Sequence, residues 1–245
     1  MMALRIAWRE LRNLFLSPLA WCVLAVVQFI LAWMFLASVE NFRGNPGGVA
    51  GVTDTVAAGL YSISSIVMLL VVPLLSMRLV AEERRSGSLA LLLSAPVRMS
   101  EIVLGKYLGL LAFLGIMVLM LTLMPLSLAL GTHLDYGKLA ADVLGLLLLL
   151  GAFAAAGLYM STLTRQPVVA AVSSFGLLLF LWIVNWLGKG DERYSTVLHY
   201  LSLIDHYGSL LGGAFDSSDV AYYLLFIATF LVLSIRRLDG QRLQH

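Results

Sequence analysis

Six stretches of apolar residues, each long enough to cross a lipid bilayer, constrain this chain more than any other feature. They run over Leu19–Val39, Val56–Met77, Val103–Leu130, Leu139–Leu163, Val168–Leu187 and Val220–Ile235. About 20 apolar residues cross the bilayer as a helix, which satisfies its own backbone hydrogen bonds. Charged residues make up only 12% of the 245 residues, against about 25% in a soluble domain. The sequence therefore predicts an all-α integral membrane protein with six transmembrane helices.

Lysine and arginine residues are concentrated in alternate connecting segments. If the N-terminus lies in the cytoplasm, most of the 16 basic residues are cytoplasmic: Arg5, Arg9, Arg12, Arg78, Arg84, Arg85, Arg98, Lys106, Arg165, Arg236, Arg237 and Arg242. The outer segments then hold only Arg43, Lys138, Lys189 and Arg193. Because cytoplasmic loops carry an excess of Lys and Arg, we expect both termini in the cytoplasm and the chain in the inner (cytoplasmic) membrane.

The segment before the first span, residues 1–18, is amphipathic. On a helical wheel its basic side holds Arg5, Arg9 and Arg12, and its apolar side holds Leu4, Trp8, Leu11, Leu14 and Phe15. This pattern is typical of a helix that lies in the membrane interface, and a basic flank that only sets topology is the alternative. A cleaved signal peptide is disfavoured, because the apolar core of the first span is too long and a long basic segment precedes it.

One further stretch, Thr196–Phe215, is long enough to cross the membrane but carries ionisable side chains. A seventh span would bury His199, Asp205 and His206 in lipid, where a central Asp costs about 2.5–3.5 kcal/mol. It would also place the basic end of the chain outside. A helical wheel instead separates an apolar side from a polar side. We therefore predict a re-entrant or interfacial outer helix within residues 188–219, before the last span.

Sequence motifs for catalysis are absent from this chain. It contains no G-x-x-x-x-G-K-[ST] P-loop, no H-E-x-x-H and no G-x-S-x-G, and Cys22 is its only cysteine. The pair Asp205–His206 can bind a metal or a proton, but such a pair more often solvates an interface. We therefore expect no catalytic residue, no metal site and no cofactor in this chain. The net charge of +2 is too small to indicate nucleic-acid binding.

Few polar residues lie within the predicted spans: Gln28, Asn185, and Asp142 near one end. An ion-coupled transporter usually needs ionisable groups near the middle of the membrane. A self-sufficient secondary transporter is therefore supported only by Pro73 and Pro125, which can break helices. Pro125 also predicts a kink near the outer end of the third span.

Small residues recur in the third and fourth spans. Gly105 and Gly109 form a G-x-x-x-G pattern, and Gly145, Gly151, Ala155, Gly157 and Ser161 lie along the fourth span. Such residues permit close helix packing. The pattern leaves open whether that packing is within one subunit or between two.

The largest predicted cytoplasmic segment, residues 78–106, begins with the charged cluster Glu82, Glu83, Arg84 and Arg85. The following residues Ser86, Gly87 and Ser88 can start a short helix, in which Leu89, Leu92 and Leu93 share a face until Pro96 ends it. A solvated loop with its leucines on lipid is one interpretation. A docking site for a soluble partner, with an apolar face and a charged shoulder, is the other.

The stretch "AEERRSGSLALLLSAPVRMSEIVLGKYL" resembles the cytoplasmic loop of ABC-2 type transporter permeases. It has that family's acidic-basic cluster, then Gly and a small hydroxyl residue, a Leu-rich stretch, a Pro and a Gly-Lys. "LHYLSLIDHYGSLLGGAFDSSDVAYYL" is similar to the family's outer segment before the last span, and "ELRNLFLSPLAW" to its N-terminal entry. The resemblance covers nearly the whole chain, with closest similarity to permeases associated with gliding motility and copper-centre maturation.

The resemblance implies a single transmembrane permease domain over residues 1–245 that works as half of a transporter. Two permeases, a second copy or a paralogue, would form the membrane part, and two ATPase subunits would bind ATP and Mg beneath it. Residues Ser86–Ser94 would be the coupling helix, with Leu89, Leu92 and Leu93 as apolar anchors. The charged cluster would orient it, and one hypothesis is that Glu83 and Arg85 set the angle of the loop. The N-terminal helix would be the elbow helix.

The resemblance leaves export and mechanical transmission open. ATP-driven motion could move a substrate, or it could act on a periplasmic or membrane accessory protein without transport. Lipids, glycans, peptides and drugs are all exported by such permeases, so the substrate is not predicted.

Overall fold

The structure, a computed structural model, describes residues 2–44, 51, 53–87, 98–188, 200–213 and 216–242. These residues form helices throughout and contain no β-strand, which confirms the all-α class. The elements are α1 (Met2–Leu16), α2 (Pro18–Gly44), the π-helical turn η1 (Thr53–Ala57), α3 (Ala58–Ser76), α4 (Ala81–Ser86), α6 (Met99–Ser127), the 3-10 turn η2 (Leu128–Leu130), α7 (Tyr136–Leu163), α8 (Pro167–Gly188), α10 (Leu203–Leu211) and α11 (Ser217–Arg242).

Six helical segments of the described chain are long and apolar enough to cross a membrane, and each overlaps one of the six predicted spans. They are α2, the stretch Thr53–Ser86 that includes α3 and α4, and then α6, α7, α8 and α11. The third predicted span, Val103–Leu130, ends beyond its helix, in η2. Most of the helices extend beyond the apolar runs. The reason is that an apolar run marks only the part that needs lipid, whereas a helix can continue into polar flanks such as Glu40 and Arg43 at the end of α2.

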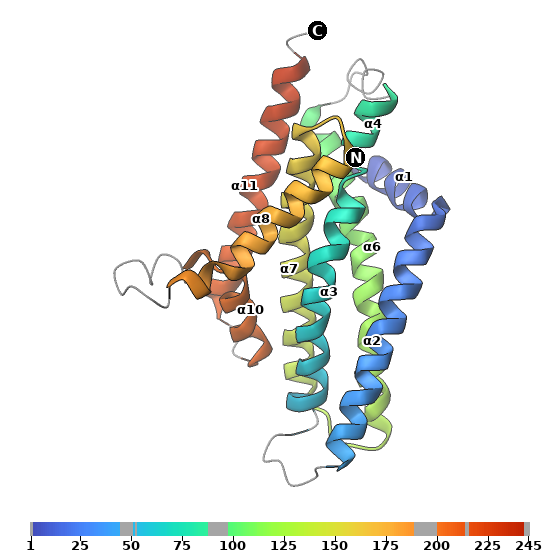
Figure 1. The fold of residues 1–245 in the computed structure, drawn as a ribbon, viewed down its shortest axis with the longest axis vertical. Helices are drawn as coiled ribbons and strands as arrows, with labels where there is room; N and C mark the ends of the chain where they lie inside the picture. The colour runs from blue at the N-terminus through green and yellow to red at the C-terminus, as the bar shows by residue number, and fades with distance from the viewer. Residues whose placement is uncertain are drawn as a thin grey trace.

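Helix α7 lies at the centre of the bundle (Figure 1). It contacts α3, α6, α8, α10 and α11, and 67% of its apolar window is buried, against 28% in α2, α8 and α11. Small side chains explain this position. A Cβ atom at Gly157 would lie 2.2 Å from Ser76 Oγ, so α3 can approach α7 this closely only because Gly157 has no side chain.

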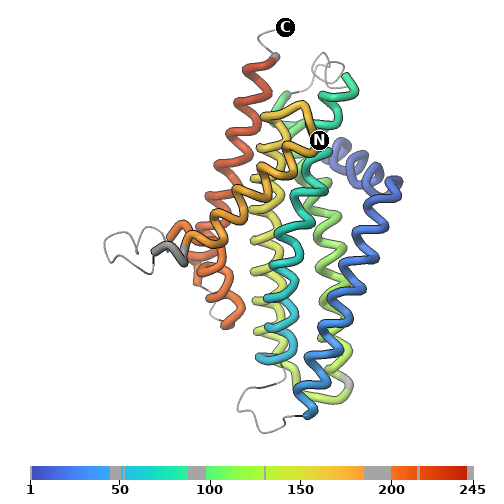
Figure 2. Tube along the Cα trace, viewed as in Figure 1, coloured from blue at the N-terminus to red at the C-terminus, as the bar shows by residue number. Residues whose placement is uncertain are grey.

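The two ends of the bundle differ. At one end lie α1, α4 and the C-terminal end of α11, and we call this the α1–α4 end (Figure 1). The start of α7 and the turn η2 lie at the opposite end. The tube view shows α8 leaning away from the direction of α3 and α7, with α10 between α8 and the first turns of α11 (Figure 2).

The predicted break in the third span lies just after Pro125. Helix α6 continues through this proline to Ser127, and η2 begins at the next residue, Leu128. A proline lacks the N–H that would bond to the carbonyl four residues earlier, and here it lies within the last turn of the helix.

The charged cluster of the predicted coupling loop forms the helix α4. This helix ends at Ser86 because Gly87 adopts a left-handed conformation with φ of 76° and donates its N–H to the carbonyl of Arg84, a favoured role for glycine. Ser86 is the last residue of α4, and the helix predicted over Ser86–Ser94 stays a prediction. Ser88, Leu89, Leu92 and Leu93 lie outside the described residues.

Candidate functional site

The start of α4 is fixed to the central helix by one hydroxyl group. Ser161 Oγ of α7 accepts hydrogen bonds from the backbone N–H groups of Val80, at 3.1 Å, and Ala81, at 2.9 Å. It donates to the carbonyl oxygen of Met77 at 3.0 Å. The first N–H groups of a helix have no partner within the helix, so Ser161 caps α4 and sets its direction. In the sequence, Ser161 stands out only as one of the small residues of the fourth span.

A buried ion cluster joins three helices at the α1–α4 end. The side chain of Lys106, on α6, is 1% exposed, and its Nζ lies 2.6 Å from Glu10 Oε1 on α1. The same Nζ lies 2.7 Å from Glu83 Oε1 on α4. A buried charge is tolerated only when it is paired, so the ammonium group of Lys106 holds α1 and α4 against α6. In the sequence, this lysine is part of the Gly-Lys of the loop pattern, which by itself predicts no ion pair.

The G-x-x-x-G pattern of α6 packs against α1. A Cβ atom at Gly105 would lie 2.6 Å from Ile6 Cβ, and one at Gly109 would lie 2.8 Å from Glu10 Cβ. The absence of side chains at these two glycines lets the α1 backbone approach α6 and brings Glu10 to Lys106. Of the two interpretations, the structure therefore shows packing within one subunit.

Helix α1 has three distinct sides, whereas the sequence pattern distinguished only a basic side and an apolar side. Ile6 and Glu10 are buried against α6. The predicted basic residues Arg5, Arg9 and Arg12 are exposed on a second side. Leu4 and Trp8, which are 65% and 70% exposed, lie on a third. An exposed tryptophan beside exposed arginines is typical of a helix at a membrane interface, and the interfacial position stays a prediction.

The other charged residues of α4 reach neighbouring helices or face outward. Arg84 Nη2 donates to Gln241 Oε1 near the end of α11. Glu82 forms an ion pair with Arg78, with 3.6 Å between Oε2 and Nε. Arg85 is exposed. A cleft between α1 and the end of α3 and α4 is lined by polar residues that include Glu10, Asn13, Ser17, Arg78, Glu82 and Glu83. Of the charged residues of α4, Glu83 and Arg84 therefore link α4 to other helices, whereas Arg85 is exposed.

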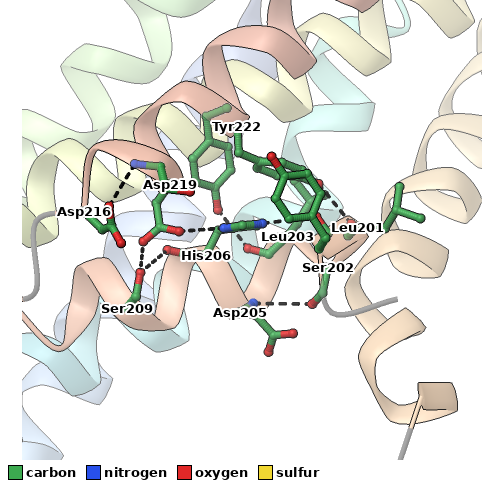
Figure 3. Close-up of polar contacts among 12 residues, drawn as sticks. Leu201, Ser202, Leu203, Asp205, His206, Ser209, Asp216, Asp219 and Tyr222 are labelled. Atoms are coloured by element: carbon green, nitrogen blue, oxygen red, sulfur yellow. Dashed lines mark hydrogen bonds and ion pairs between the residues drawn. The ribbon is translucent and has the colours of Figure 1, made fainter. Parts of the chain in front are cut away.

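A second polar cluster lies between α10 and α11 (Figure 3). His206 was predicted to lie on a polar side that solvates an interface together with Asp205. It is buried instead, and its Nδ1 lies 2.6 Å from Asp219 Oδ1. The prediction failed because the partner is not the neighbour in sequence but a residue on the next helix. In the part of the chain that the structure describes, no group of three or more His, Cys, Asp or Glu residues could hold a metal ion.

The six apolar helices make this chain a multi-pass membrane protein. The family described as ABC-2 family transporter protein matches residues 4–242. The chain therefore belongs to this family, which confirms the resemblance drawn from its loop, outer segment and N-terminal entry. Membership supports the role of a permease and implies in general an ABC ATPase as partner. A comparison with curated proteins finds no match.

Proposed function

We propose that this chain is the membrane-spanning permease subunit of an ABC-2 type transporter, and that its α1–α4 end receives movement from a separate ATPase subunit. The observation that carries this proposal is the position of Lys106. This residue joins the elbow helix α1 and the charged helix α4 to the transmembrane helix α6 through two close ion contacts. A force applied to α4 is therefore passed directly to the bundle.

The linkage extends beyond the ion cluster. Helix α4 also reaches α7 through Ser161 and α11 through the contact of Arg84 with Gln241. Residues 88–97 follow α4 directly in the chain, and we assign Leu89, Leu92 and Leu93 as the apolar anchors on the ATPase. Exposed Glu82 and Arg85 orient the docked partner, whereas Glu83 acts inside the bundle as a counterion.

In this arrangement the α1–α4 end and both termini face the cytoplasm, and the chain lies in the inner membrane. This follows the excess of Lys and Arg at that end. Two copies of the permease, or one copy and a paralogue, pair in the membrane above two ATPase subunits. ATP and Mg are bound by the ATPase, and this chain contributes no catalytic residue. The cycle drives either export or mechanical work on an accessory protein.

The docking assignment is tested by co-purification of the tagged permease with its ATPase from membranes. We expect the double substitution Leu89→Asp and Leu92→Asp to abolish co-purification, because two carboxylates cannot be buried in an apolar contact. The control is Tyr136→Asp, at an exposed residue at the opposite end of the bundle, which should leave co-purification unchanged. Retained ATPase binding in the double variant would contradict the assignment.

A further inference from the structure

Three arginines from different parts of the chain lie close together at the α1–α4 end, and we call them the arginine cluster. Arg84, on α4, is half-buried, and the charges of Arg237, on α11, and Arg165, between α7 and α8, are close enough to act on it. Figure 1 shows α4, the end of α7 and the end of α11 at this end of the bundle. Because like charges repel one another, the cluster is unfavourable unless an anion is bound to it.

Contacts between the elements bring the three arginines together independently of their charges. Arg84 donates a hydrogen bond to Gln241 on α11. Arg237 lies four residues before Gln241, so both side chains are on the same side of that helix. Helix α4 also contacts α7 and α8, and Arg165 lies in the short connection between those two helices. The cluster is therefore fixed by the packing of α4 on three other elements.

No carboxylate neutralises the arginine cluster within the described ranges. The ion pairs there include none of its members, and the partner of Arg84 is the uncharged amide of Gln241. Asp239 is close to Arg237 in the chain, but a separation of two residues places it on the other side of α11. The segment that follows α4, residues 88–97, contains no Asp or Glu. The anion that fits this cluster must therefore come from outside the bundle.

The arginine cluster lies where the helices leave the hydrocarbon layer of the membrane. Arg165 comes two residues after the end of α7 at Leu163, and Arg237 comes two residues after the end of the last apolar run at Ile235. Both arginines are exposed. The headgroups of phospholipids lie just outside the hydrocarbon core, and basic pockets between transmembrane helices on the cytoplasmic side bind anionic headgroups.

Exposed apolar side chains continue from the cluster toward the middle of the membrane. They include Val168 and Val172 on the first turns of α8, and Leu233 on α11. Leu233 lies one turn before Arg237, on the same side of the helix. A phospholipid bound by its phosphate at the cluster therefore finds apolar surface for its acyl chains. A free phosphate ion or an acidic protein segment has no use for this surface.

We propose that Arg84, Arg165 and Arg237 form a binding site for the phosphate of an anionic phospholipid, shared by α4, the α7–α8 connection and α11. A guanidinium group presents paired N–H donors that match the oxygens of a phosphate. A headgroup with a net negative charge, such as that of phosphatidylglycerol, offsets the repulsion within the cluster, whereas the choline of phosphatidylcholine adds a further positive charge. The site therefore selects anionic over zwitterionic lipids. This inference does not depend on the ATPase docking assignment.

The selectivity can be measured on the full chain. The protein is purified in detergent, freed of lipid and titrated with phosphatidylglycerol or with phosphatidylcholine, and native mass spectrometry gives the fraction of chains that carry one lipid. We expect phosphatidylglycerol to bind more tightly by a factor on the order of ten or more, since each arginine adds to the attraction. Equal affinity for the two lipids would overturn the proposal.

Substitutions separate the arginine cluster from the general positive charge of this end. Arg165→Gln and Arg237→Gln change exposed side chains, and each should weaken the binding of phosphatidylglycerol about fivefold, the contribution of one arginine near an anionic membrane surface. The control Arg9→Gln removes an exposed arginine of α1 at the same end and should leave the affinity unchanged. An equal loss in the control, or no loss in the two cluster variants, would contradict the site.

Two further measurements test the half-buried arginine and the source of the phosphate. Arg84→Gln should weaken the binding of phosphatidylglycerol, and Arg84→Lys, which keeps the charge, should retain most of it. Equal affinities of these two variants would exclude Arg84 from the site. Inorganic phosphate at the concentration of the lipid should not displace phosphatidylglycerol, because it lacks acyl chains. Displacement would assign the cluster to free phosphate and overturn the lipid assignment.

Discussion

At the scale of single residues, two buried charges of this protein have opposite surroundings. Lys106 is enclosed by Glu10 and Glu83. Asp142 is fully buried on α7, and within the described ranges neither of its carboxylate oxygens has a hydrogen-bond partner. Lys138, one turn away on the same helix, pairs with Asp54 instead. We therefore expect the charge of Lys106 to stabilise the folded protein and the charge of Asp142 to destabilise it.

Replacing Lys106 by Met should strongly destabilise the protein. The substitution leaves two carboxylates close together and without their counterion, and breaking a buried ion pair in this way costs about 3–5 kcal/mol. The measurement is the unfolding free energy of the purified chain in detergent. The matched control is Lys138→Met, which removes a more exposed lysine and should cost about 0–1 kcal/mol. Equal losses in the two variants would contradict a structural role for the cluster.

Replacing Asp142 by Asn should stabilise the protein at neutral pH. The asparagine has nearly the same shape but carries no charge, and a buried unpaired charge costs more free energy than a buried unpaired amide. Thermal unfolding at neutral and at acidic pH checks this. The advantage should shrink in acid, because the carboxyl group of the parent is then also neutral. A lower melting temperature for Asp142→Asn would mean that the carboxylate has a favourable partner.

At the scale of helices, the close contacts between elements depend on glycines at particular positions, where a side chain would collide with the neighbouring helix. Helix α1 reaches α6 over Gly105 and Gly109, and α3 reaches α7 over Gly157. The same helix α6 contains Gly115, where an added Cβ would meet nothing within 4 Å. In the sequence, all of these are glycines in an apolar helix. Only the packing shows which of them are required for a close contact between helices.

Gly109→Ala should displace α1 from α6. Its Cβ would lie 2.8 Å from Glu10 Cβ and 2.9 Å from the carbonyl oxygen of Ala7, and the backbone atom cannot rotate away. Overpacking of this kind costs about 1–3 kcal/mol. The control Gly115→Ala should instead stabilise the helix by about 1 kcal/mol, the difference in helix propensity. Unfolding free energies decide the sign, and stabilisation by both substitutions would show that α1 does not rest on Gly109.

At the scale of the whole molecule, α7 forms the axis on which the other helices pack. Small residues along this helix leave room for α3, α8, α10 and α11, so its window is far more buried than those of the peripheral helices. The two polar clusters lie at different places on this bundle. One joins α1, α4 and α6 at the α1–α4 end, and the other joins α10 to α11.

The sequence alone determined the class of this protein, its six spans and its family. Those properties depend on local quantities, because the length and hydropathy of a segment suffice to require a helix in lipid, and the loop pattern is contiguous in the chain. It could not identify the partners of Lys106 and His206, or show that Asp142 has no hydrogen-bond partner within the described ranges. Glu10 and Lys106 are far apart in the chain, and Asp219 lies on the helix that follows α10. Such pairings depend on how helices rotate and approach one another, and that was decided by the close packing at Gly105, Gly109 and Gly157 in the tertiary structure.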